Sequence, residues 1–135
     1  MKHHSEIRYW LSIRALELMR FVSLVGFQDD RFGRRANDIL ILLAVAIGHH
    51  EDKPMTAAKI AHYIGMARPT AIRRINIMVH EGVLHYTKSK QVCFSKELEQ
   101  RAELIMPVLK QSRILRNVVY LSKMDTSHIA ANENQ

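Results

Sequence analysis

Basic and polar side chains gather in two short stretches of this sequence. The first stretch contains Arg68, Pro69, Thr70, Arg73, Arg74 and Asn76, and the second contains Lys88 and Lys90. Guanidinium groups form paired hydrogen bonds with guanine or neutralise phosphates, and an asparagine amide reads the edge of a base. Lysines bind phosphate as point charges. These residue types therefore fit recognition of a polyanion that carries bases.

The charge distribution supports the same interpretation. The chain has 20 Lys and Arg against 13 Asp and Glu, a net charge of +7 at neutral pH. Residues 56–90 hold six of the basic side chains and one acidic one, so most of the excess charge lies in about a quarter of the chain. A concentrated positive field is typical of proteins that bind nucleic acid. Charge alone leaves a simpler alternative open, a solvated face that happens to be basic.

Two short helical patterns would position the first stretch. Thr56 suits the N-cap of a helix over residues 57–64, and Gly65 suits its C-terminal end. Pro69 fits the first turn of a second helix, residues 69–81, where its missing N–H costs nothing. Two short helices joined by a tight turn form a helix-turn-helix.

A hairpin would position the lysines. Apolar residues alternate in "VLHYT" and "QVCF", and the polar "KSK" lies between these two runs. A helix-turn-helix followed by a hairpin with a basic tip is a winged helix. We predict that residues 69–81 enter the major groove of double-stranded DNA and that the wing, residues 87–91, contacts the backbone or the minor groove. One of the two arginines has another possible role, because Arg73 or Arg74 could instead pair with Glu81 or another acid across the edge of the core.

Longer helical patterns flank this core. Residues 5–26 have apolar side chains on two sides of a helix, which predicts packing on the domain and on a partner subunit. A second helix, about 34–47, is predicted to end at Gly48 as its C-terminal cap. Apolar residues recur from residue 95, at Leu98, Ala102, Ile105 and Leu109 and then at Leu115, Val118 and Leu121. Pro107 should kink or break this helix near residues 103–106.

We therefore predict a mainly α single domain, residues 1–135, with a small β-hairpin. The winged helix-turn-helix core spans 34–94, flanking dimerisation helices span 5–33 and 95–124, and a flexible tail spans 125–135. A ligand pocket, if the protein has an effector, is expected between the first helix, the second helix and the start of the helix-turn-helix.

The stretch "MTAAKIAHYIGMARPTAIRRINIMVHEGVLHY" resembles the winged-helix core of the MarR-type transcriptional regulators. The matching positions are Ile60-Ala61 in the first helix, Thr70 and Arg73 as Thr-x-x-Arg, and Met78, Gly82 and Val83 at the end of the second helix. The resemblance implies a homodimer joined through the terminal helices, an operator with two half-sites, and regulation by a small molecule or oxidant. The family's Asp-x-Arg near the wing tip is replaced here by "TKSKQ", in a shorter wing. Other winged helices, including plasmid replication and partition proteins and modules for protein–protein interaction, remain alternatives.

Other classes of function find little support in the sequence. Gly-rich phosphate loops, nucleophile elbows and paired catalytic carboxylates are missing, so we predict no enzyme activity and no cofactor. Adjacent histidines such as His49-His50 lack the spacing of a zinc site, and Cys93 fits a half-buried strand residue better than an oxidant sensor. A single cysteine fits a reducing cytoplasm. The apolar run 39–47 is far shorter than the roughly 20 residues of a membrane span, so no membrane contact is expected.

Overall fold

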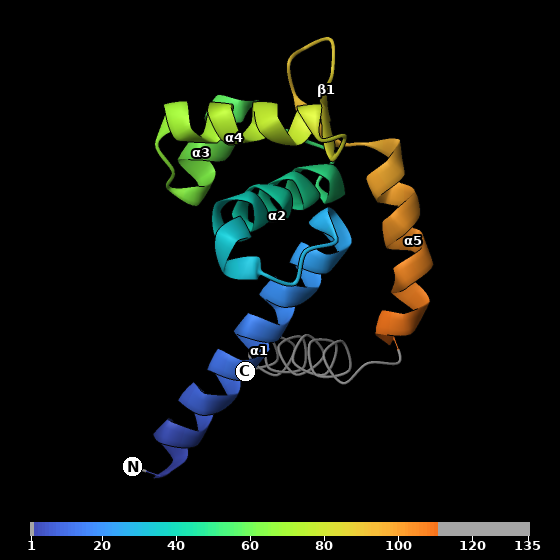
Figure 1. The fold of residues 1–135 in the computed structure, drawn as a ribbon. Coiled ribbons are helices and arrows are strands. Elements are labelled where there is room, and N and C mark those ends of the chain that lie inside the picture. Colours follow the sequence, from blue (N-terminus) through green and yellow to red (C-terminus); the bar gives the residue numbers. More distant parts are fainter. Residues whose placement is uncertain (1, 111–135) are drawn as a thin grey trace, which may run out of the picture.

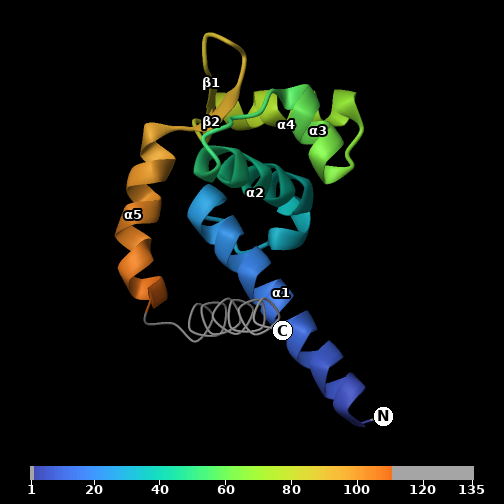
Figure 2. The same ribbon diagram turned by 180° about the vertical axis from the view of Figure 1, so that it is seen from behind.

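The computed structural model describes residues 2–110 (Figures 1 and 2). The predicted helical segment that contains Leu115, Val118 and Leu121, and the predicted tail 125–135, lie outside the described residues. The elements in chain order are α1 (Lys2–Phe27), the 3-10 helix η1 (Phe32–Arg35), α2 (Ala36–His50), α3 (Ala57–Ile64), α4 (Arg68–His80), β1 (Leu84–Tyr86), β2 (Val92–Phe94) and α5 (Lys96–Lys110).

The helix-turn-helix forms where local signals predict it. The Thr56 side chain accepts a hydrogen bond from the Lys59 N–H at 3.3 Å and caps α3. Gly65 ends α3 in the left-handed region with φ +69°, where a residue without Cβ is least strained. Pro69 lies in the first turn of α4, as expected from its fixed φ. Helices α3 and α4 then pack directly on each other (Figure 1).

The hairpin is antiparallel, with Leu84 opposite Phe94 and Tyr86 opposite Val92. Its second strand also bonds to the chain just before α3. The Val92 N–H donates to the Met55 carbonyl at 2.8 Å, and Thr56 and Gln91 form an isolated β-bridge. A two-stranded hairpin is marginal by itself, so these bonds and the buried Leu84 and Val92 fix it on the helices.

One hydrophobic core joins the helix-turn-helix to α2 and the hairpin. Ile60, Ile75 and Met78 are fully buried between α3, α4 and α2. Further buried members come from α2, the loop before α3, the hairpin and the start of α5, and they are Ile41, Leu42, Ala44, Val45, Met55, Val83, Leu84, Val92 and Leu98. Helix α2 lies beneath the α3–α4 pair in Figure 1 and supports it along its length. The candidate functional helix α4 therefore rests on a packed base.

Two sequence-based boundaries were wrong. Gly48 does not end α2, which continues to His50, and Gly48 is buried inside the helix. A Cβ on Gly48 would lie 3.0 Å from the Lys53 carbonyl oxygen and 3.4 Å from the Pro54 Cα. The glycine is needed because the returning chain crosses the helix closely, which is a long-range contact invisible to a capping rule. Likewise, Pro107 does not break α5, which continues helically to Lys110, whereas the kink predicted as the other outcome stays a prediction.

Helix α1 extends away from the rest of the described chain (Figure 1). Its C-terminal half packs on α2, where Val22 and Val25 contact the core. Several large apolar side chains toward its N-terminus are more than half exposed, among them Ile7 (54%), Trp10 (53%), Leu11 (62%) and Leu16 (54%). The predicted dimerisation helices are therefore present in part as helices, with apolar surface that the described chain leaves in solvent.

Candidate nucleic-acid interface

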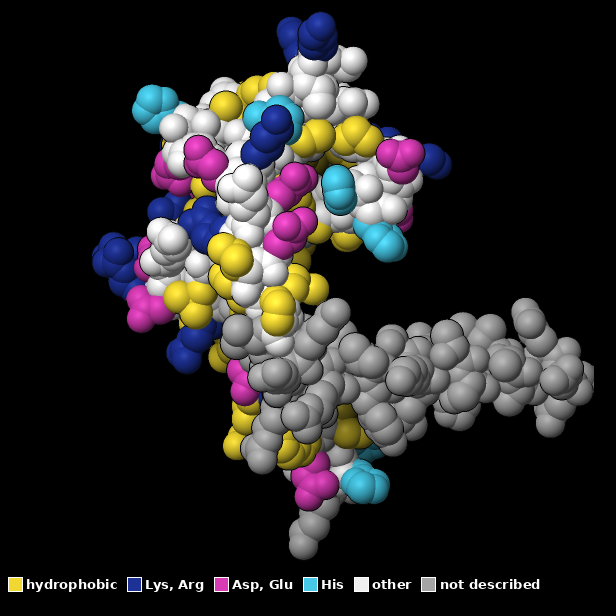
Figure 3. Space-filling model, turned by 90° about the vertical axis from the view of Figure 1, so that its right-hand side faces the viewer, with side chains coloured by type: hydrophobic (Ala, Val, Ile, Leu, Met, Phe, Trp, Pro, Cys, Tyr) yellow, Lys and Arg dark blue, Asp and Glu magenta, His cyan; other side chains and the backbone are white. Residues whose placement is uncertain are grey.

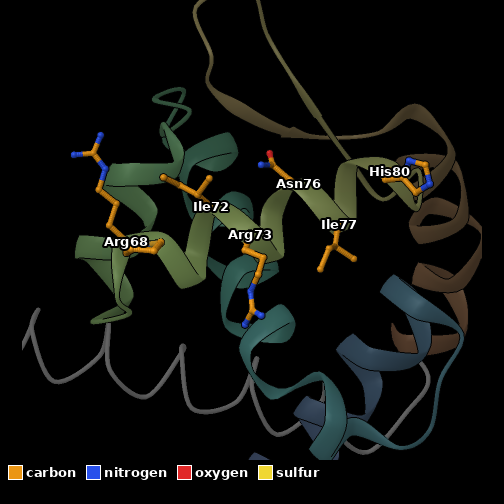
Figure 4. A pocket seen from close by; sticks show the side chains of 7 residues that line it. Arg68, Ile72, Arg73, Asn76, Ile77 and His80 are labelled. Atoms are coloured by element: carbon orange, nitrogen blue, oxygen red, sulfur yellow. The ribbon is translucent and has the colours of Figure 1, made fainter.

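The outer face of α4 carries a stripe of polar residues. Pro69, Arg73, Asn76 and His80 are all exposed and are spaced by four, three and four residues, so they lie along one side of the helix. The opposite side holds the buried Ala71, Ile75 and Met78. The buried side is the packing side predicted for this helix, whereas of the residues predicted to point outward Thr70 is half-buried and Arg74 turns inward. Figure 4 shows Ile72 and Asn76 on the upper side of α4 in that view and Arg73 and Ile77 on the lower side.

Sequence reasoning missed three residues on this face. Ile72, Ile77 and His80 line an open hollow of about 760 Å³ over α4, together with Arg68, Pro69, Arg73 and Asn76. The spacing that groups Pro69, Arg73 and Asn76 would have added His80, had it been extended by one turn. Ile72 and Ile77 gave a weaker signal, because an apolar residue in a short amphipathic helix is usually assigned to the core. Apolar groups beside polar ones suit a DNA major groove, where thymine presents a methyl group.

Arg74 points to the other side of α4 and forms an internal ion pair. Its Nε donates to Asp38 Oδ1 at 2.7 Å and its Nη2 donates to Asp38 Oδ2 at 2.6 Å. Asp38 lies in the first turn of α2 and its side chain is 1% exposed. The hydrogen bond to Asp38 raises the pKa of Arg74, although the arginine is cationic at any physiological pH. The structure therefore favours the internal pairing that the sequence left open for Arg74 over a DNA contact.

The Asp38–Arg74 pair belongs to a larger ionic network beneath α4. Arg35 Nη1 lies 3.3 Å from Asp38 Oδ2 and 3.4 Å from Glu81 Oε2, so it links α2 to the C-terminal end of α4. Arg35 also stacks on the Phe27 ring, with 4.5 Å between its guanidinium carbon and the ring centroid. The middle of α4, through Arg74, and its C-terminal end, through Glu81, are consequently tied to the start of α2, which helps to fix the orientation of the exposed stripe.

Asn76 is connected to the hairpin. The Tyr86 hydroxyl donates to Asn76 Oδ1 at 2.6 Å, so β1 and α4 meet at a side chain on the exposed stripe. In Figure 4 Asn76 lies at the edge of the stripe that faces the strands, and Arg73 extends from the other edge. The predicted site residues on α4 therefore diverge, and only Asn76 lies next to the wing.

The predicted wing is a short ordered turn. The Thr87 N–H donates to the Gln91 carbonyl at 2.9 Å, and the Lys90 N–H donates to the Thr87 carbonyl at 2.9 Å. Lys90 has φ +59°, a left-handed conformation that closes the turn. Lys88 and Lys90 are both exposed, and basic side chains cap the protruding end of the molecule in Figure 3. The wing thus presents charge beyond the surface of α4.

The first turn of α4 contains two further predicted site residues. Arg68 is exposed and Thr70 is half-buried. The N-cap residue is Ala67, whose methyl side chain cannot accept a hydrogen bond from the first turn. Backbone N–H groups at such an end favour a phosphate oxygen. Arg68 and Thr70 therefore flank a position suited to a phosphate, and their contact with DNA stays a prediction.

Residues 34–88 match the IclR helix-turn-helix domain. This match indicates a DNA-binding domain of the winged helix-turn-helix kind in a transcription regulator. It covers less than half of the chain and gives no support to the MarR subtype. No match was found among the curated proteins or among the solved structures compared. The match begins at residue 34 and ends at residue 88, between the two strands of the hairpin.

Other candidate chemistries gain no structural basis in the described residues. Cys93 is half-buried in β2, opposite His85, whose Nδ1 lies 3.0 Å from the Phe94 carbonyl oxygen. Within residues 2–110, no group of three or more His, Cys, Asp or Glu side chains could hold a metal ion. In the same range no helix is long and apolar enough to cross a membrane.

A cleft of about 480 Å³ lies between α1, α2 and α5, away from the exposed stripe. Its walls are mainly apolar, with Phe21, Leu42 and Phe94 among them, and Glu99 and Glu103 also line it. The sequence placed a pocket between the first two helices and the start of the helix-turn-helix. The third wall is instead α5 and the end of β2, because the chain after the hairpin returns alongside α1.

Proposed function

We propose that this protein is a sequence-specific regulator that binds double-stranded DNA as a homodimer. Helix α4 enters the major groove, and the wing contacts the backbone or the minor groove beside it. The observation that carries this proposal is the exposed stripe of Pro69, Arg73, Asn76 and His80, held outward by a buried base and flanked by a basic wing. The helix-turn-helix match over residues 34–88 supports the same function.

The proposed contacts divide by chemistry. Arg73 and Asn76 are assigned to base edges, and Arg68, Thr70, Lys88 and Lys90 are assigned to phosphates. Arg74 acts indirectly, because its guanidinium is held by Asp38. A two-fold dimer would recognise half-sites about 10 base pairs apart, or a multiple of that distance.

The homodimer is supported by the apolar surface of α1. Four large apolar side chains on this helix, Ile7, Trp10, Leu11 and Leu16, are each more than half exposed. Contiguous exposed apolar surface of this kind usually marks an interaction site. A second copy of α1 is the partner that also gives two recognition helices, and this arrangement is the one implied by the MarR-type resemblance.

We also propose that a small-molecule effector regulates DNA binding, as the MarR-type resemblance implies. We assign it to the cleft between α1, α2 and α5, because that cleft touches both the proposed dimerisation helix and the support of α4. A location in the cytoplasm, where DNA and a reduced Cys93 would both be found, belongs to the same proposal.

The test is fluorescence anisotropy with a mixed-sequence duplex of about 30 base pairs, titrated at several salt concentrations. Wild-type protein is expected to bind with a dissociation constant of about 10⁻⁴ to 10⁻⁶ M, weakening steeply as salt rises. Arg73→Ala should bind more weakly, whereas Arg8→Ala, which removes an exposed arginine from α1, should not. Folded wild-type protein that fails to bind at low salt would contradict the proposal and favour a module for protein–protein interaction.

A further inference from the structure

The contact between Tyr86 and Asn76 joins the two elements that would meet DNA. Tyr86 is the last residue of β1 and its hydroxyl donates to Asn76 Oδ1 over 2.6 Å. Tyr86 lies opposite the buried Val92 in the hairpin, and the hairpin is bonded through Val92 to Met55. The tyrosine is therefore held by backbone pairing, while Asn76 is held by α4.

An asparagine amide needs such a partner to read a base unambiguously. Its oxygen accepts and its nitrogen donates, yet the two ends have nearly the same shape, so rotation by 180° exchanges them at little steric cost. The Tyr86 hydroxyl donates to Oδ1 in the structure and so holds the amide with its oxygen toward the wing; in the turned-over amide, Nδ2 would have to donate to the same hydroxyl oxygen. Oδ1 keeps a second lone pair, and both hydrogens on Nδ2 are directed away from that bond.

In the selected orientation the amide distinguishes the two purines. Adenine presents an acceptor at N7 and a donor at N6 in the major groove, which an amide matches with Nδ2 and Oδ1. Guanine presents two acceptors, N7 and O6, so the fixed Oδ1 would face O6 without a hydrogen between them. An amide that can turn over loses part of this discrimination.

We propose that Tyr86 is a positioning residue that fixes the amide of Asn76 and so makes this position of the half-site prefer adenine over guanine. The inference rests on the proposed function, since it assigns the base read by a helix placed in the major groove. Because Tyr86 acts through Asn76, it determines specificity from the wing strand without having to contact the base itself.

The protonation state of Tyr86 suits this role. Burial raises the pKa of its phenol above the usual value near 10, so the hydroxyl keeps its proton at neutral pH. A phenol that stays protonated remains a donor, and a donor is what fixes Oδ1 on the wing side. Loss of the hydroxyl alone, in Tyr86→Phe, leaves the ring in place.

The experiment is selection of operator sequences from a random duplex library by wild-type protein, followed by adenine-to-guanine replacement at each selected position. Affinities are then compared for wild type, Tyr86→Phe, Asn76→Ala and Tyr63→Phe. Tyr63→Phe is the matched control, since it removes an exposed hydroxyl from α3. Thermal unfolding and the salt dependence of binding are recorded for every variant.

The expected result is localised to one base pair of each half-site. Wild type should prefer adenine there by about 5-fold or more, and Asn76→Ala should lose that preference. Tyr86→Phe should reduce it by about 2- to 10-fold, the range expected for loss of one hydrogen bond, with preferences at all other positions and the salt slope unchanged. Tyr63→Phe should behave as wild type.

The possible failures are distinguishable. Wild-type protein that selects an operator while Tyr86→Phe keeps the full adenine preference would overturn the inference and leave the proposed function intact. The inference would also be overturned if Tyr86→Phe weakened binding equally at all positions, because that pattern signifies a general structural role. If wild type neither binds nor selects DNA, the proposed function and this inference both fall.

Discussion

The helix-turn-helix and helix α1 differ in where their apolar side chains lie. In α3 and α4, Ile60, Ile75 and Met78 have no exposed surface, and α2 and the hairpin complete their surroundings. In α1, Leu11 and Leu16 are 62% and 54% exposed. Space-filling Figure 3 also shows hydrophobic side chains at the surface on the α5 side of the molecule.

This difference indicates two kinds of stability within one chain. Residues of the helix-turn-helix gain their free energy from contacts already made inside the described structure. The first half of α1 leaves apolar area in water, at a cost of roughly 25 cal/mol for each Å² that could be buried. The stability of the helix-turn-helix is therefore expected to depend on substitutions in its interior. The burial of the first half of α1 is expected to depend on protein concentration.

The largest effect should come from Asp38→Ala. This substitution leaves the Arg74 guanidinium without its bidentate partner and also removes a contact of Arg35. Loss of one member of a buried pair typically costs 3–5 kcal/mol, and because Arg74 is about a quarter exposed we expect about 3 kcal/mol less unfolding free energy. Urea denaturation followed by circular dichroism measures it. Asp30→Ala, at an exposed carboxylate, is the control, and equal effects of the two variants would contradict the assignment.

Leu11→Glu should weaken self-association with little effect on the helix-turn-helix. Burying a leucine contributes about 1.5–3 kcal/mol, so the dimer dissociation constant should rise by at least about tenfold. Analytical ultracentrifugation over a range of concentrations measures it. Asn37→Asp adds the same charge at an exposed position of α2 and should leave association unchanged. A wild-type protein that is monomeric throughout would remove the homodimer from the proposal.

Arg73→Ala should weaken DNA binding while leaving the stability of the helix-turn-helix nearly unchanged. Arg73 is exposed, so its loss should change the unfolding free energy by no more than about 0.5 kcal/mol. DNA affinity should nevertheless fall by about 1–3 kcal/mol if the side chain bonds a base, and the loss should then depend on sequence. Parallel unfolding and anisotropy titrations test this pair of outcomes. A variant that loses stability and keeps DNA affinity would show that Arg73 stabilises the fold and does not contact DNA.

Thr56→Ala should have a smaller effect on the same region. The capping bond to Lys59 N–H is long, at 3.3 Å, so we expect a loss of about 0.5–1 kcal/mol. Thr56→Ser keeps the oxygen and should retain most of the stability. If thermal melts show serine and alanine to be equally destabilising, the side-chain cap is not what Thr56 contributes.

The smallest effect is expected from Asp29→Asn, on stability at low pH. The backbone N–H and guanidinium of Arg31 lower the pKa of Asp29 below its usual value near 4, so the carboxylate contributes stability at higher pH. That contribution should be lost as pH falls below about 4 through the lowered pKa. Asp29→Asn should therefore flatten the acid limb of a stability–pH curve. An unchanged curve would show that the exposed ion pair adds nothing measurable, as many do.

The fold of the helix-turn-helix could be predicted because its signals are local. Thr56, Gly65 and Pro69 act within a few residues of where they stand, and the hairpin follows from a period of two after Gly82. The end of α2 was predicted wrongly because Gly48 is required by the close approach of the chain at Lys53 and Pro54. A capping rule considers only the helix end and does not include such a contact. Continuation of α5 through Pro107 likewise depends on more than propensity.

The candidate site could be predicted in type and only partly in detail. Arg73 and Asn76 follow from helical spacing, and His80 would have followed from the same spacing. Arg74 could not be resolved, since its partner Asp38 lies 36 residues away and shares no pattern with it. The contact of Tyr86 with Asn76 depends on how the hairpin leans on α4, which only the folded arrangement determines.

The β-bridge between Thr56 and Gln91 has a mechanical consequence. Because Thr56 also caps α3, the base of the wing and the beginning of α3 share one joint, and the Val92–Met55 bond closes it. The start of α3 and the base of the wing are therefore coupled at this joint, and α4 is coupled to both through its packing on α3 and the Tyr86–Asn76 bond. We expect a displacement that arrives through α1 or α5 to move these three elements together. In the proposed dimer the footprint on each half-site is then constant, and only the separation of the two footprints is adjustable.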